Sequence, residues 1–336
     1  MHQQCQRRRL MAGKVLITDY VWPDLEIERS ILGELDLEIV EASDGEEETL
    51  ASLAAGCCGI LTCWAKTTRK VIEAALPDLR VIVRYGVGLD NIDVAFATEQ
   101  GIPVANVPDY CFIDVAEHTM ALLLAQSHKV AGFDRDVRSG TWSIQSRVPL
   151  NRLTERRLGL IGFGQIARQV VPRAKAFGMD VVAFSRSLTD EDAEAVGARR
   201  VELDELIESS DFISLHCPLT EETRNLIDSD ALNRMKSTAF LINTSRGEVV
   251  DEAALADALE SGEIAGAALD VRSQEPPDMP DRLIDLPNII HTPHAAFYSS
   301  DSLIELPTKA ALEVCRVIRG EELIHLVNPG HIENVK

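Results

Sequence analysis

Short apolar runs alternate with stretches of helical periodicity along nearly the whole of this 336-residue chain. In the first third, the apolar runs are rich in β-branched residues, which predicts buried strands. These runs lie at 15–20, 37–40, 59–64 and 81–86. Helical patterns separate or follow them at 24–35, 46–55, 67–76 and 93–100. Strands that alternate with helices at this spacing predict parallel βαβ units.

A second series of the same kind follows, and the length of the chain fits two domains of about 150 residues each. The predicted strands of this series lie at 158–162, 181–184, 212–216, 239–243, 266–271 and 288–292. Helical patterns at 114–135 and 300–319 are the natural connections between the two series. We therefore expect two doubly wound α/β lobes, the first of which is discontinuous in sequence if the last helix returns to it.

Charge and cysteine usage narrow the class of protein. The chain has 54 acidic and 33 basic residues and a net charge of −21, which argues against binding to nucleic acid or to an anionic membrane. Seven cysteines without a C-x-x-C pair argue against a disulfide framework or a thiolate metal site and favour the cytoplasm. No apolar run approaches the ~18–20 residues of a membrane helix, and residues 1–12 lack the apolar stretch of a secretory signal. No metal site is expected, because His291 and His294 lack an H-E-x-x-H pattern or a carboxylate cluster.

A glycine-rich turn joins the predicted strand at 158–162 to a helical pattern. Its sequence, from Gly162 and Gly164 to Ala167, has the G-x-G-x-x-[G/A] spacing of the dinucleotide fingerprint. The first glycine permits the tight turn, the second allows backbone N–H groups to approach a pyrophosphate, and the small third residue allows close packing. The helix N-terminus then presents N–H groups and the positive end of its dipole to the phosphates. The alternative is a turn that serves packing alone.

The end of the next predicted strand discriminates between cofactors. NAD sites usually carry a carboxylate about 20 residues after the glycines, bonded to the ribose 2′-OH. Here the strand ends in Ser185 and Arg186. A guanidinium can pair with a 2′-phosphate, so the sequence favours NADP(H), with NAD(H) as the other possibility. The alternative for Arg186 is a solvated loop cation.

Three loops of the second series each carry an ionisable residue beside turn chemistry. Arg246, Glu275 and His294 follow three different predicted strands, and ligands of α/β sheets bind outside the carboxyl ends of strands. An arginine, a glutamate and a histidine on neighbouring loops suit an anion clamp, an orienting group and a proton carrier. Each could equally be a member of a surface ion pair.

Eight motifs occur in order along the chain and carry a family resemblance. They are RYGVGLDNID, IPVANVPDY, VAEHTMALLLA, GFGQIA, LHCPLTEETRNLI, AFLINTSRGEVVDEAAL, AALDVRSQEPP and TPHAAFYS. With them the chain resembles the D-isomer-specific 2-hydroxyacid dehydrogenase family from about Val15 to about Gly320. HAAFYS and the following DSLIEL look most like the branch that contains the C-terminal-binding-protein dehydrogenases.

The resemblance implies a division of the chain and a catalytic set. Residues 13–112 and 301–336 would form a flavodoxin-like substrate domain, and residues 113–300 a dinucleotide-binding Rossmann domain, with a cleft between them. Arg246 would hold the substrate carboxylate and polarise its carbonyl, His294 would be the general acid/base, and Glu275 would pair with His294. The chemistry agrees, because histidine titrates near neutral pH and an adjacent carboxylate favours its protonated form.

The same resemblance implies further binding residues and a homodimer built on the cofactor lobe. Backbone N–H groups of Val87 and Gly88 would grip the substrate carboxylate. The residues implied at the cofactor are Gln165, Ile166, Cys217, Pro218, Thr223, Thr244, Ser245, Arg246, Asp270 and Ala296. The alternative for Asp270 is a strand-end residue bonded to backbone. Ser185 departs from the usual acidic residue, and Phe297 leaves the size of the substrate open.

The leading hypothesis is therefore a dehydrogenase that interconverts a small 2-oxo acid, such as glyoxylate, hydroxypyruvate or pyruvate, with its D-2-hydroxy acid. A nucleotide-sensing scaffold of the corepressor kind is the alternative from another class, and phosphite or formate oxidation is a further possibility. For His118, which lies in a helical stretch, packing is favoured over catalysis.

Overall fold

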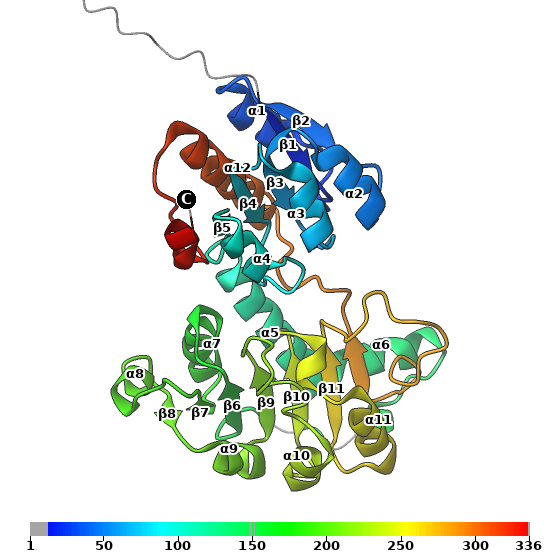
Figure 1. Cartoon of the computed structure of the whole chain (residues 1–336). Helices are drawn as coiled ribbons and strands as arrows, with labels where there is room; N and C mark the ends of the chain where they lie inside the picture. The colour runs from blue at the N-terminus through cyan, green and yellow to red at the C-terminus, as the bar shows by residue number, and fades with distance from the viewer. Residues whose placement is uncertain (1–12, 148–149, 151, 335–336) are drawn as a thin grey trace, which may run out of the picture. The chain divides into compact units, whose positions relative to one another are not determined.

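The protein is described here from a computed structural model, which describes residues 13–147, 150 and 152–334 (Figure 1). The N-terminal stretch considered above as a signal lies outside these residues. The chain divides into two compact units. The first unit holds the described residues up to Tyr110 together with those from Ser299 onward, and the second runs from Cys111 to Tyr298. Within the described ranges, no helix combines the length and apolarity that crossing a membrane requires.

The first unit is built on a five-stranded parallel sheet. Its strands are β1 (Lys14–Ile17), β2 (Glu38–Glu41), β3 (Cys57–Thr62), β4 (Val81–Arg84) and β5 (Val104–Ala105). Their order, β2-β1-β3-β4-β5, is the flavodoxin-like order. β5 was not predicted, because two residues are too few to produce a periodic signal.

Helices cover the sheet of the first unit. They are α1 (Glu26–Gly33), α2 (Glu47–Ala54), α3 (Arg69–Ala75), α4 (Val94–Glu99) and α12 (Ser302–Arg319). α12 packs on α1, β3 and β4, and a Cβ on Gly59 would lie 3.3 Å from Val314 Cγ1. The C-terminal helix therefore completes the first unit, which is discontinuous in sequence.

The second unit is built on a seven-stranded sheet, also parallel throughout. Its strands are β6 (Arg157–Ile161), β7 (Asp180–Phe184), β8 (Arg199–Arg200), β9 (Phe212–Leu215), β10 (Phe240–Asn243), β11 (Gly266–Leu269) and β12 (Ile289–His291). The order β12-β11-β10-β9-β6-β7-β8 is the Rossmann order with one added strand. The strand order reverses between β6 and β9, where sheets of this kind bind ligands. The predicted fold class, two doubly wound parallel α/β lobes, is confirmed.

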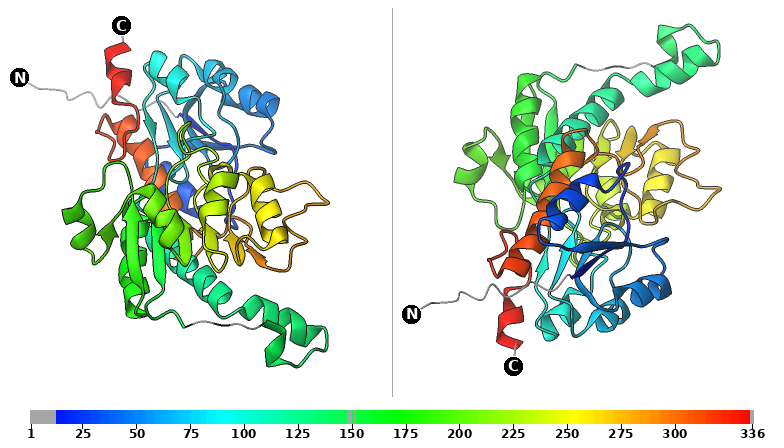
Figure 2. Two further views of the ribbon diagram at one scale, coloured as in Figure 1. Left: turned by 90° about the horizontal axis from the view of Figure 1, so that it is seen from below. Right: turned by 90° about the horizontal axis from the view of Figure 1, so that it is seen from above.

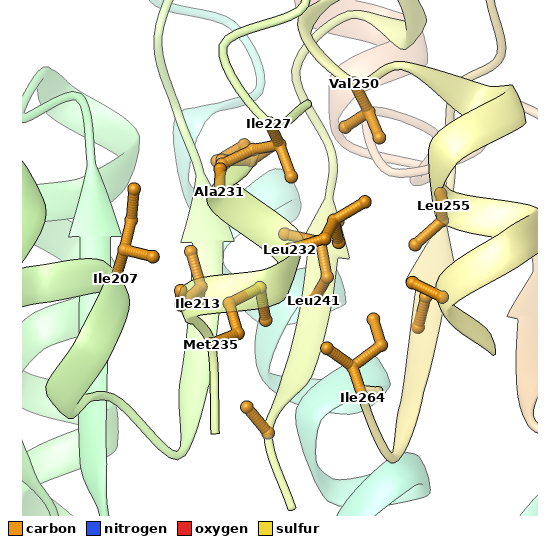
Figure 3. Packing of buried hydrophobic residues seen from close by; sticks show 14 of the residues in the cluster. Ile207, Ile213, Ile227, Ala231, Leu232, Met235, Leu241, Val250, Leu255 and Ile264 are labelled. Atoms are coloured by element: carbon orange, nitrogen blue, oxygen red, sulfur yellow. The ribbon is translucent and has the colours of Figure 1, made fainter. Parts of the chain in front are cut away.

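Two layers of helices enclose the second sheet. Its helices are α5 (Phe112–Ser127), α6 (Val130–Arg138), α7 (Gln165–Ala176), α8 (Asp190–Glu194), α9 (Leu203–Ser209), α10 (Ser229–Arg234) and α11 (Glu252–Ser261). α5 and α7 pack together and contribute to one apolar core, whereas α9, α10 and α11 build the other. Figure 3 shows the second core, where Leu232 of α10 lies over Leu241 of β10 and Leu255 of α11 lies close by. Apolar residues on both faces of the strands explain their continuous hydrophobic runs.

The helical pattern predicted as one long helix over 114–135 is two helices in the structure. α5 ends at Ser127, and Lys129 adopts a left-handed conformation with φ of 50° before α6 begins. In the last turn of α5, the Leu124 carbonyl accepts from both the Ser127 hydroxyl and the His128 N–H. α5 buries eight of its residues, whereas Gly132 is the one buried residue of α6. The chain thus leaves the core of the second unit at the end of α5, where the apolar face of that helix ends.

Candidate active site

The glycine-rich turn lies at the point where the strand order of the second sheet reverses. Gly162 directly follows β6 and has a φ of 92°, a conformation that favours glycine. A Cβ at this position would lie 2.5 Å from the carbonyl carbon of His216 and 2.6 Å from the Cys217 nitrogen. These are backbone atoms at the end of β9, so they cannot move aside as a flexible side chain would. Glycine is therefore required here by both conformation and space.

The residues beyond Gly162 fit a pyrophosphate. Gly164 is the N-cap of α7, and a Cβ there would meet no atom within 4 Å. Gln165 and Ile166 open the helix, and no side chain caps its first turn. The fully buried Ala167 lies in the core on the sheet side, as its place in the fingerprint predicts. The N-terminus of α7 is exposed, and Gly164 has no side chain that would block a ligand from it. Such a helix N-terminus suits an anion, so these residues could hold a dinucleotide.

The end of β7 lies next to this turn, because the Gly162 N–H donates to the Phe184 carbonyl at 2.8 Å. Ser185 and Arg186 follow directly. The Arg186 side chain is 74% exposed, and its guanidinium lies 3.9 Å from the carboxylate of Glu222, which is 67% exposed. Arg186 therefore lies two residues beyond the end of β7, the strand beside the glycine turn, and has an acidic neighbour that competes for it.

The loop after β9 is organised by one threonine. Thr223 Oγ1 donates to the Pro218 carbonyl at 2.7 Å and accepts from the Thr220 N–H at 2.7 Å. Burial raises the pKa of the Cys217 thiol to about 11 and lowers the pKa of His216 to about 4. Both groups are therefore neutral near pH 7, so this loop offers hydrogen bonds and apolar contact rather than charge.

The loop that carries Arg246 is fixed by the buried side chain of Asn243 at the end of β10. The Asn243 amide donates to the Arg246 carbonyl at 2.8 Å, and its oxygen accepts from the Ser245 N–H and hydroxyl at 2.9 Å each. Gly247 follows, and a Cβ there would lie 1.9 Å from the Arg272 carbonyl carbon. The Arg246 loop thus packs directly on the backbone that leads to Glu275.

His294 and Glu275 form the closest ion pair of the site. His294 Nδ1 lies 2.6 Å from Glu275 Oε2, while Glu275 Oε1 accepts from the Arg272 N–H at 2.8 Å. Burial raises the pKa of Glu275, but the bonds from His294 and Arg272 and the charge of Arg246 outweigh burial and lower it. Glu275 is therefore ionised near neutral pH. The Nδ1 atom of His294 is thus held by Glu275.

The backbone around His294 is unusual and is held by Asp270 at the end of β11. His294 has a φ of 53°, which is strained for a side chain of this size. Its N–H donates to the Asp270 carbonyl at 2.7 Å, and the buried Asp270 carboxylate accepts from the N–H groups of Ala295 at 2.8 Å and Ala296 at 3.0 Å. Asp270 thus fixes the His294 loop. Its predicted contact with the nicotinamide amide stays a prediction.

Sequence comparison assigns the family. Residues 120–296 match the profile described as "D-isomer specific 2-hydroxyacid dehydrogenase, NAD binding domain". The chain belongs to this family. It is 39% identical over 327 residues to D-3-phosphoglycerate dehydrogenase of Methanocaldococcus jannaschii, covering 96% of this chain but 61% of that protein. It is 43% identical over 263 residues to glyoxylate reductase of Korarchaeum cryptofilum, covering 77% and 79%.

Structural comparison gives the same result. D-lactate dehydrogenase of Aquifex aeolicus, solved with NAD and lactic acid, superposes with a TM-score of 0.83 at 30% identity, over 94% of this chain and 99% of that one. The predicted family is thus confirmed. The chain spans under two thirds of the length of the phosphoglycerate dehydrogenase it matches.

Most predicted site residues of the second unit lie at the carboxyl ends of its strands. The glycine turn follows β6, Ser185 and Arg186 follow β7, the loop of Cys217 follows β9, and Arg246 follows β10. Val87 and Gly88 belong to the first unit, in the loop after β4, and their contact with substrate stays a prediction. Among the described residues, no group of three His, Cys, Asp or Glu side chains is arranged to hold a metal ion.

Two features of the site were missed by sequence reasoning. Arg272 lies under the Glu275 loop, where its guanidinium bonds Glu252 at 3.0 Å and Asp281 at 2.8 Å. His118 of α5, for which packing was favoured, lies 3.0 Å from the Thr292 hydroxyl, two residues before His294. The sequence signal for this role of His118 was its place in the motif VAEHTMALLLA, which precedes the glycine turn.

Proposed function

We propose that this chain reduces small 2-oxo acids to D-2-hydroxy acids, and catalyses the reverse oxidation, with a nicotinamide cofactor. The observation that carries the proposal is the 2.6 Å pair between His294 and the ionised Glu275, on the same sheet edge as Arg246 and the glycine turn. Family membership supports the reaction class.

Each residue has one task. The Arg246 guanidinium bonds the substrate carboxylate and draws electron density from the adjacent carbonyl. We propose backbone N–H groups of Val87 and Gly88 as further donors to a substrate carboxylate. A reduced nicotinamide cofactor, when bound at the glycine turn, supplies the hydride. His294 Nε2 donates the proton that the developing alkoxide needs, and Glu275 stabilises the protonated imidazole before the transfer. In oxidation, the neutral imidazole accepts the hydroxyl proton.

Glyoxylate and hydroxypyruvate are the substrates we favour, because the matching relatives include a glyoxylate reductase. The test is a panel of 2-oxo acids, with glyoxylate, hydroxypyruvate and pyruvate as members, assayed with NADH and NADPH. His294→Asn is the control for enzyme-dependent turnover. Absence of turnover with every acid and both cofactors would refute the proposal.

For the cofactor we propose a preference for NADP(H). Arg186 supports it, since a charge-assisted bond to a 2′-phosphate strengthens binding. Solvent screens the exposed guanidinium and Glu222 competes for it, so we expect a modest preference, about 10-fold in kcat/KM. The variant combining Ser185→Asp with Arg186→Ala should reverse the order. A wild type that prefers NADH would make Arg186 a solvated cation and leave the dehydrogenase assignment intact.

We also propose a cytoplasmic homodimer. The six described cysteines are thiols, which suits a reducing compartment.

α6 and the short 3-10 helix Ile144–Arg147 extend away from their own sheet (Figure 2). These two helices and the connection between them expose Val130, Val137, Trp142 and Ile144. Such an apolar extension suits contact with a second copy. Light scattering at micromolar concentration tests this, and an active monomer would contradict it.

A further inference from the structure

Two adjacent residues of α5 reach two different loops of the proposed active site. Thr119, which is fully buried, lies with its hydroxyl 3.1 Å from the Thr244 hydroxyl, at the base of the Arg246 loop. His118 Nε2 lies 3.0 Å from the Thr292 hydroxyl, at the base of the His294 loop. One helix turn is therefore bonded to both loops.

The direction of each bond follows from proton counting, because a hydroxyl has a single proton to donate. Thr119 Oγ1 donates to the Val115 carbonyl at 2.8 Å, so Thr244 must donate to Thr119. Thr292 Oγ1 donates to Asp270 Oδ1 at 2.5 Å, so His118 Nε2 must donate to Thr292. His118 therefore carries a proton on Nε2, which also lies 3.5 Å from Asp270 Oδ1.

The His118 bond ends on the carboxylate that holds the catalytic loop. The chain of bonds runs from His118 through Thr292 to Asp270, and Asp270 accepts from the N–H groups of Ala295 and Ala296. His294 lies between Thr292 and Ala295, both of which are bonded to Asp270. Its backbone conformation is strained, and such a conformation persists only where its surroundings fix it.

We infer that His118 and Thr119 are positioning residues that set the Arg246 and His294 loops relative to each other. The inference rests on the proposed function for its catalytic meaning. His118 acts on His294 through Thr292 and Asp270, and Thr119 acts on Arg246 through Thr244. Neither touches the reacting atoms. A displacement of about 1 Å between clamp and proton donor is enough to lower turnover by about 100-fold.

Ordinary helix packing is the alternative, and α5 provides a matched control for it. At the far end of α5, the buried Gln126 side chain donates to the carbonyl of Ala267, which lies near the amino end of β11, whereas the Asp270 loop follows the carboxyl end of that strand. Gln126→Leu removes a helix-to-sheet bond of the same kind without involving Thr292 or Thr244. A purely structural role of α5 predicts equal effects of changes at Gln126 and His118.

The experiment compares His118→Phe, His118→Gln and Gln126→Leu with wild type. His118→Phe keeps the ring but removes the donor, whereas the glutamine amide can donate from nearly the same place. We expect His118→Phe to lower kcat about 10- to 100-fold while the KM for the 2-oxo acid changes less than about threefold. His118→Gln should recover kcat to within about fivefold of wild type. Gln126→Leu should lower the Tm but leave kcat nearly unchanged.

A second readout does not depend on activity. Hydrogen exchange of a peptide spanning 292–298, followed by mass spectrometry, should be faster in His118→Phe than in wild type. In His118→Gln the exchange should return toward the wild-type rate. If wild type reduces no 2-oxo acid, the proposed function fails, but the exchange comparison still decides the inference. Unchanged exchange, or a kcat in His118→Phe equal to that in Gln126→Leu, would overturn it.

Discussion

Replacing Arg272 by methionine tests how the loop of Glu275 is held. Arg272 has a side chain only 10% exposed and bonds two carboxylates, those of Glu252 and Asp281. Arg282, on the same loop, also bonds two carboxylates, at 2.6 and 2.7 Å, but is 51% exposed. The two arginines thus have the same number of partners and differ in burial, which makes Arg282→Met a matched control.

The expected magnitude follows from burial. Removing one member of a buried ion pair typically costs about 3–5 kcal/mol, because the remaining charge stays desolvated. Glu252 and Asp281 keep some exposure, so we expect about 3 kcal/mol for Arg272→Met. For Arg282→Met we expect a loss of stability that is small by comparison, since solvent screens an exposed pair.

The stability difference should also depend on pH. Burial raises the pKa of Asp281, but the bonds from Arg272 and the Ile284 N–H outweigh it and hold the pKa below the ordinary 3.8. A carboxyl whose pKa is lower in the folded state stabilises fully above its unfolded pKa, and loses that contribution as pH falls through the folded pKa. The gap between wild type and Arg272→Met should therefore be constant near neutral pH and narrow below about pH 4.

Urea unfolding at pH 7 and at pH 3.5 measures both effects, with the slope compared to confirm that the unfolded state is unchanged. Activity gives a third readout. The backbone N–H of residue 272 bonds Glu275 directly, so the Glu275 loop should shift when the Arg272 side chain no longer anchors it. Equal destabilisation by Arg272→Met and Arg282→Met would refute the argument from burial.

Three further outcomes are expected. Arg246→Lys should lower kcat/KM for 2-oxo acids by at least about 10-fold, because lysine cannot form the bidentate pair with the substrate carboxylate. Cofactor affinity, measured by fluorescence titration, should stay unchanged. Wild-type turnover would exclude the assigned role. In Glu275→Gln, the rate of reduction should fall off at lower pH than in wild type, since the protonated imidazole loses its partner, and an unshifted profile would speak against the pair. Gly162→Ala should weaken NADPH and NADH alike, as its Cβ would collide with the backbone of His216, and undiminished binding would show that the turn can relax.

Much of the fold was predictable because strands buried on both faces produce continuous apolar runs, and because turn chemistry marks where they end. β5 and β8 escaped because each has two residues. The break between α5 and α6 escaped because Lys129 gives no sequence signal for a left-handed conformation. Glycine and proline patterns marked the loops of Arg246, Glu275 and His294. The bonds of Arg272 and His118 were not predictable, since they join residues up to 174 positions apart that only the folded second unit brings together.

The return of α12 to the first sheet has a consequence for biosynthesis. The second unit is an uninterrupted stretch, so it can fold as soon as it leaves the ribosome. The first unit cannot, because α12 begins at Ser302, about 220 residues after Arg84 ends β4, the last strand on which it packs. At about 5–20 residues per second, the ribosome needs roughly 10 to 40 s to deliver α12. During that interval the apolar surface around Gly59 lacks its covering helix, so the nascent first unit exposes apolar side chains that the complete unit buries.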